Sequence, residues 1–94
     1  MKFIYESNRI YIKEKDSVIA EVKYRRINDV TFDIYSTYVD PKYRGRHLGK
    51  ELLEKAYNYL KSKEYNVEAT CSYANKWLQT TNKKKEIWNE KGIK

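Results

Sequence analysis

The first part of the chain alternates between apolar and polar residues with a period of two, which predicts β-strands with one dry face. Phe3 to Tyr5 is one candidate strand, and Ile10 and Ile12 share one face of a second. In the two strands expected next, the dry face would hold Val18, Ala20, Val22 and Tyr24, and then Val30, Phe32 and Ile34. Lys15-Asp16 and Asn28-Asp29 supply turn residues between the strands, so we expect antiparallel pairing.

The pattern then changes to helical spacing. One stripe of an amphipathic helix is predicted to contain Leu48, Leu52, Leu53, Ala56, Tyr57 and Leu60. A short strand from Asn66 to Cys71 follows, with Val67 and Ala69 on the same face as Cys71. A second short helix is expected after Ser72, with Ala74, Trp77 and Leu78 as its apolar positions.

This order of elements predicts an α/β (α+β) layer fold. A strand, a helix and a further strand in succession form a crossover whose two strands run parallel. The remaining strands are joined by short turns and are expected to be antiparallel. The sheet is therefore predicted to be mainly antiparallel, packed with a central amphipathic helix and a short C-terminal helix.

Length and composition restrict the chain further. Its 94 residues make a single domain over 1–94, in which about 81–94 form a basic tail rich in Lys and Asn. The single cysteine makes no internal disulfide, which favours a reducing, cytoplasmic location. No apolar run approaches the ~20 residues that span a bilayer. We expect no membrane association, and a monomer or weak dimer.

The chain is basic, with 20 Lys and Arg against 13 Asp and Glu and a net charge of +7. This charge predicts attraction to anions, of which nucleic acid, acidic membranes and phosphorylated cofactors are all examples. A solvated lysine-rich surface accounts for much of it. A small nucleic-acid-binding domain is a less favoured possibility, because the basic residues cluster on one element only at Arg44 to Lys50.

The segment from Arg44 to Lys50 has the features of a phosphate-binding site. A proline and a glycine lie in the loop that leads into the predicted helix, and Arg44, Arg46 and Lys50 surround the turn. A helix start offers free backbone N–H groups and the positive end of the helix dipole. The alternative is an ordinary turn between a strand and a helix, but such a turn more often carries an acidic or capping residue.

The same residues resemble motif A of the GNAT acetyltransferase superfamily, Arg/Gln-x-x-Gly-x-Gly/Ala. Here the motif runs from Arg44 to Gly49, and His47 stands where the family usually has its first motif glycine. With Cys71-Ser72-Tyr73 downstream, the chain resembles minimal single-domain GNAT-like proteins that carry Cys-x-Tyr after the last core strand. The resemblance covers roughly Val18 to Trp77.

The resemblance implies acetyl-coenzyme A as the cofactor. The motif loop would hold its pyrophosphate. The residues then expected at the cofactor are Arg44, Gly45, Arg46, His47, Leu48, Gly49 and Lys50, together with Thr37, Tyr38 and Val39, where the end of a strand would pair with the pantetheine amides. A simple buried strand end remains the alternative for Thr37 to Val39.

Two catalytic candidates follow from the resemblance. Cys71 would be a nucleophile or acyl carrier, and its alternative is a small packed hydrophobe. Tyr73 would protonate the departing thiolate of coenzyme A, and its alternative is an ordinary packed aromatic residue. Ser36 replaces a histidine of the family, so no general base is visible, although Asp40 and Glu68 are possible substitutes.

The sequence therefore predicts an acetyl-coenzyme A-binding protein that transfers an acetyl group to an unknown amine or thiol. A binding module that holds the acyl-coenzyme A without transferring the acyl group is the alternative. The interval from Lys13 to Ser17 is too short for the helices that full GNAT domains carry there, which suggests an open acceptor face. One His and one Cys suggest no metal site.

Overall fold

The computed structural model describes residues 2–80, so the tail predicted for 81–94 lies outside the described residues. The elements are β1 (Phe3–Glu6), β2 (Arg9–Glu14), β3 (Ser17–Asn28), β4 (Thr31–Val39), a 3-10 helix η1 (Pro41–Tyr43), α1 (Leu48–Ser62), β5 (Asn66–Ala69) and α2 (Ser72–Thr80). The predicted order of strands, helix, strand and helix is confirmed. Neither helix in this part of the chain is long and apolar enough to cross a membrane.

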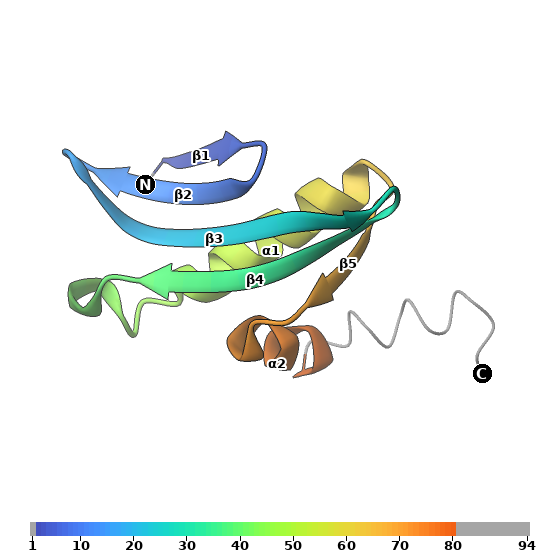
Figure 1. The fold of residues 1–94 in the computed structure, drawn as a ribbon. Helices are drawn as coiled ribbons and strands as arrows, with labels where there is room; N and C mark the ends of the chain where they lie inside the picture. Colours follow the sequence, from blue (N-terminus) through green and yellow to red (C-terminus); the bar gives the residue numbers. More distant parts are fainter. Residues whose placement is uncertain (1, 81–94) are drawn as a thin grey trace.

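The five strands form one sheet in the order β1-β2-β3-β4-β5 (Figure 1). β1 to β4 are joined by short turns and pair antiparallel. β4 and β5 are joined through α1 and pair parallel over four residue pairs, from Thr31↔Asn66 to Ile34↔Ala69. The mainly antiparallel sheet and the parallel crossover pair are therefore as predicted.

Helix α1 crosses one face of the sheet and forms the core with it (Figure 1). All six residues of the predicted apolar stripe are buried, and Leu52, Leu53 and Ala56 are fully inaccessible. Ile10 and Ile12 of β2 are buried as expected. α2 joins the edge of this core through Trp77, whose ring lies edge-on to Tyr57 of α1 at 6.0 Å between centroids.

The pairing of β3 with its two neighbours has three register shifts, one of them at Ile27 near the end of β3, and the other two change the expected alternation. Ile12 pairs with Ala20 and Lys13 with Val18, so Ile19 is an extra residue in β3. Ile19 is buried, and Val18 lies on the other face from Ala20. The prediction that Val18 shares the dry face was therefore wrong, because an inserted residue reverses the side-chain phase.

The second bulge lies in β4. Tyr24 pairs with Ile34 and Lys23 with Ser36, which leaves Tyr35 as the extra residue. Thr37 and Val39 therefore lie on the same face as Ile34. At the start of the strand, Val30 belongs to the turn and is 54% exposed, so its expected place in the core was wrong.

Candidate functional site

β4 is longer than its parallel neighbour, and this difference opens the sheet. The pairing with β5 ends at Ile34↔Ala69, whereas β4 continues to Val39. The N–H groups of Thr70 and Cys71 both donate to the carbonyl of Ile34, at 3.1 and 3.2 Å. The edge of β4 beyond Ile34 therefore has no β5 partner, and an extended ligand can pair there as an added strand would.

The loop after β4 is held by side-chain contacts at both ends. Asp40 caps the 3-10 turn by accepting a hydrogen bond from the N–H of Lys42 at 2.9 Å. The Tyr43 hydroxyl donates to Glu14 at the end of β2, and this bond raises the pKa of Tyr43. Arg44 donates from Nε to the carbonyl of Val39 at 3.1 Å. The two terminal nitrogens of its guanidinium have no acceptor within residues 2–80.

The backbone at the start of α1 has two residues of positive φ separated by one that is not, an alternation found in anion-binding nests. Gly45 has φ +85° and His47 has φ 63°, whereas Arg46 between them does not have a positive φ. Successive N–H groups in such alternating conformations point into one concavity and bind anions. The first helical bond runs from Glu51 N–H to the His47 carbonyl at 3.0 Å. Within residues 2–80, the N–H groups of 45–50 have no acceptor.

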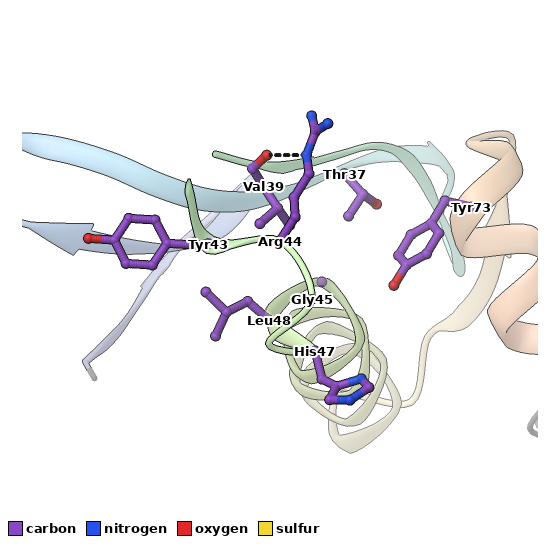
Figure 2. Close-up of a pocket in the computed structure, with 9 residues that line it drawn as sticks. Thr37, Val39, Tyr43, Arg44, Gly45, His47, Leu48 and Tyr73 are labelled. Atoms are coloured by element: carbon purple, nitrogen blue, oxygen red, sulfur yellow. Dashed lines mark hydrogen bonds between the residues drawn. The ribbon is translucent and has the colours of Figure 1, made fainter. Parts of the chain in front are cut away.

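A cavity of about 400 Å³ lies between the end of β4, this loop, and the starts of α1 and α2 (Figure 2). Its lining consists of Thr37, Val39, Tyr43, Arg44, Gly45, His47, Leu48, Gly49 and Tyr73. Eight of these nine residues are among the site residues predicted from the sequence. Tyr43 was missed, because no motif marks it and its place depends on the distant Glu14.

Tyr73 forms the side of the cavity that belongs to α2. In Figure 2 its ring extends toward the first turn of α1, and Thr37 lies between it and Val39. A Cβ placed on Gly49 would lie 3.2 Å from a ring carbon of Tyr73 and 3.3 Å from its hydroxyl oxygen. The motif glycine therefore permits the close approach of Tyr73 to α1.

Cys71 lies beside the cavity rather than in its lining. It is partly buried, and its thiol donates to the Thr37 hydroxyl with 3.6 Å between sulfur and oxygen. Thr37 does line the cavity, so one hydrogen bond separates the cysteine from the cavity wall. Tyr38 and Arg46 are not part of the lining either; Arg46 lies over the Tyr43 ring, 5.2 Å from its centroid.

A second cavity of about 460 Å³ lies on the other side of Tyr73 and His47. Besides these two residues it is lined by Lys50, Lys76, Trp77 and Thr80. The two cavities share two walls, so one long ligand can occupy both. The two lysines make the second cavity suitable for phosphate groups. Lys76 was not predicted, because a lone lysine on a helix gives no sequence signal.

Carboxylates are absent from the lining of both cavities within the described part of the chain. Asp40 caps the 3-10 turn, and Glu68 is an exposed residue of β5. Residues 2–80 also contain no group of three or more His, Cys, Asp or Glu side chains that could hold a metal ion. The fully buried carboxylate of Asp33, on β4, was not predicted as a site residue.

The left-handed conformation of His47 leads to a prediction. We expect His47→Gly to raise the free energy of unfolding by about 1 kcal/mol, because a residue with a Cβ is strained at positive φ and glycine is not. Urea denaturation of the free protein measures this change. His47→Ala is the matched control, since it removes the imidazole and keeps the Cβ. Equal stability of the two variants would contradict backbone strain at this position.

The fold is similar to that of solved acetyltransferase structures. A GCN5-like N-acetyltransferase candidate from Staphylococcus aureus, solved by NMR, is 24% identical with a TM-score of 0.74, over 87% of this chain and 81% of that one. An IAA acetyltransferase from Bacillus cereus is 20% identical with a TM-score of 0.62, over 78% and 52%.

A third structure is more distant. An aminoglycoside acetyltransferase from an uncultured soil sample, in complex with sisomicin, is 15% identical with a TM-score of 0.57, over 81% of this chain and 58% of that one. This chain thus spans little more than half the length of the last two proteins. At these identities the likeness shows the fold alone.

The family is shown by the sequence itself. No curated protein matches the chain. The family model for GCN5-related N-acetyl-transferases matches residues 9–87, which is most of the length of this chain. That range contains β2 to α2, the motif loop and both cavities. Together with the mixed sheet and its opening beside β4, this match shows that the chain belongs to the GCN5-related N-acetyltransferase family.

Proposed function

We propose that this protein binds acetyl-coenzyme A and transfers its acetyl group to an amine or a thiol. The observation that carries the proposal is the row of backbone N–H groups at 45–50, which have no acceptor in the described chain and open onto a cavity beside the part of β4 that has no β5 partner. A pyrophosphate suits the nest, and the pantetheine amides suit the free strand edge.

The proposed place of each part of the ligand follows from the cavities. The pyrophosphate would lie against the nest at Gly45 to His47, with Arg44 adding charge-assisted hydrogen bonds. The pantetheine would run along β4 past Val39 toward Thr37. The nucleotide end would enter the second cavity, where Lys50 and Lys76 would contact its phosphate. Tyr38 and Arg46 would act at the rim.

The chemistry proposed for the acyl end uses Cys71 and Tyr73. The Cys71 sulfur would attack the thioester carbonyl carbon and form a new C–S bond, while the C–S bond to coenzyme A breaks. The departing sulfur of coenzyme A would take a proton from the Tyr73 hydroxyl. The proton that Cys71 loses would then restore this hydroxyl. The acetyl group would pass from Cys71 to the acceptor in a second step.

A binding module without transfer is the second candidate, and one observation favours it. No carboxylate of the described residues lines either cavity, so a carboxylate base that could deprotonate an amine acceptor is missing from these walls. Acetyl-coenzyme A that stays intact beside the protein and a range of amines and thiols would support this candidate over the first.

A titration of isotope-labelled protein with acetyl-coenzyme A tests the binding proposal. We expect saturable backbone amide shifts centred on 39–50, with Tyr73 and Cys71 also moving, because most of 39–50 and Tyr73 line the two cavities and Cys71 is hydrogen-bonded to Thr37 of the lining. A short acetyl thioester that lacks the nucleotide and pyrophosphate is the matched ligand control. It should bind much more weakly, since it cannot use the nest.

The variant control for this titration is Arg44→Gln, which keeps a hydrogen-bonding side chain and removes the positive charge. We expect it to lower the affinity about tenfold, the effect of one charge-assisted bond. An absence of shifts at millimolar acetyl-coenzyme A, or shifts confined to the far end of the sheet, would contradict the proposal.

A further inference from the structure

Asp33 is the one buried charged residue in the part of the chain that the structure describes. Its exposure is 1%, and it alternates with Phe32 and Ile34, so it faces away from α1. Arg25, its cross-strand partner on β3, donates from Nε to Oδ2 at 3.3 Å. Burial of a carboxylate is costly unless its oxygens are hydrogen-bonded. The arrangement around Asp33 therefore needs an explanation.

The other bonds of Asp33 go to a single residue just after β5. The backbone N–H of Thr70 donates to Oδ1 at 2.7 Å, and the Thr70 hydroxyl donates to Oδ2 at 2.8 Å. Both carboxylate oxygens of Asp33, on β4, thus accept hydrogen bonds from Thr70. Thr70 is the last residue before Cys71.

These bonds lie at the point where the sheet opens. Thr70 and Cys71 share the Ile34 carbonyl as acceptor, and no further pairing between β4 and β5 follows. The chain then enters α2, where the Asn75 side-chain amide donates to the Ala69 carbonyl at 3.1 Å. The position at which the chain leaves the sheet sets where the Cys71 thiol reaches Thr37 and where Tyr73 meets Gly49.

We propose that Asp33 is a positioning residue for acetyl transfer, acting through Thr70 to hold Cys71 and Tyr73 against the cavity. This inference rests on the proposed function. Asp33 is not part of the cavity lining, and its oxygens are occupied by Thr70 and Arg25, so it does not act as a proton acceptor. The step it supports is the exchange in which the Cys71 thiol takes the acetyl group and coenzyme A leaves as a thiol.

The test compares Asp33→Asn and Thr70→Val with the wild type. Thr70→Val keeps the backbone N–H and removes the hydroxyl, and Thr70→Ser restores the hydroxyl. Thr31→Val is the control, because it makes the same change at a threonine of β4 that is 6% exposed and has no bond to Asp33 or Thr70. Each variant is first checked for folding by circular dichroism and thermal unfolding.

The readouts are the affinity for acetyl-coenzyme A and the single-turnover acetylation rate of Cys71 by mass spectrometry across pH. We expect Asp33→Asn to lower the rate about 100-fold, the scale of a small misplacement of a reacting group. Thr70→Val should lower it about tenfold, with rescue by Thr70→Ser. Affinity should not change, and Thr31→Val should behave as wild type.

A second readout does not require acetyl transfer. The rate at which iodoacetamide alkylates Cys71, and the amide shifts of 71–73, report the placement of this segment directly. Both should change in Asp33→Asn and Thr70→Val, even if wild-type protein only binds acetyl-coenzyme A and the proposed transfer fails. Unchanged alkylation and shifts in folded variants would overturn the inference. So would loss of the acidic limb of the rate–pH profile in Asp33→Asn alone, which would make Asp33 a proton acceptor.

Discussion

Replacement of Cys71 by alanine is expected to lower acetyl transfer by about three orders of magnitude or more, the scale seen when a nucleophile is removed. Affinity for acetyl-coenzyme A should be unchanged, because the thiol lies one hydrogen bond behind the cavity wall at Thr37. Intact-mass measurement should show an acetyl adduct on the wild-type protein and none on Cys71→Ala. Isothermal titration of both proteins gives the affinities.

Tyr73→Phe is the companion variant for this prediction. It keeps the ring against Gly49 and removes only the hydroxyl, so binding should persist. Loss of a general acid lowers a rate by about 10²–10⁴-fold. Full transfer by Cys71→Ala would exclude the cysteine as acyl carrier and leave direct transfer to the acceptor as the reaction.

The elements that depend on local sequence could be predicted. The helical stripe from Leu48 to Leu60 is buried as its spacing indicated, and Ile10 and Ile12 are buried on β2. The crossover between β4 and β5 followed from the order of the elements, since a strand, a helix and a strand in one sheet pair in parallel. In each case the prediction needs only the spacing of residues within an element or the order of the elements along the chain.

The bulges could not be predicted, because the residues involved are ordinary strand residues. Ile19 and Tyr35 carry no glycine or proline signal, yet each is the extra residue that reverses the phase of its strand. The phase matters for the site, since it turns Thr37 and Val39 toward the cavity. A bulge depends on the pairing of two strands, and a single strand does not show it.

The candidate site also has one part that the sequence predicts and another part that depends on contacts between distant residues. Arg44 to Gly49 is one continuous segment, made of the loop before α1 and the first two residues of the helix, and both its charges and its glycines are visible in the sequence. The bond between Asp33 and Thr70 joins residues 37 positions apart, and Tyr43 reaches Glu14 across 29. Only the folded sheet brings such residues together, and for that reason the support around Cys71 was missed.

The second large expected effect concerns stability. Leu52 is fully buried in the center of the α1 stripe, and Leu52→Ala should lower the free energy of unfolding by about 3 kcal/mol. This is a large share of the ~5–15 kcal/mol that holds a small domain. Urea denaturation followed by circular dichroism measures it. Glu54→Ala, an exposed position of the same helix, is the control and should change stability by less than about 0.5 kcal/mol.

The same helix connects this loss to ligand binding. The N-terminus of α1 supplies free N–H groups of the nest, so the nest exists only while the apolar stripe of α1 is packed on the sheet. A ligand that binds only the folded state raises the free energy of unfolding. When the ligand is in excess, this increase grows with the logarithm of the ratio of its concentration to the dissociation constant. Saturating acetyl-coenzyme A should therefore raise the unfolding midpoint of Leu52→Ala and of wild type alike. A Leu52→Ala variant as stable as Glu54→Ala would contradict the role given to the buried stripe of α1 in holding the nest in place.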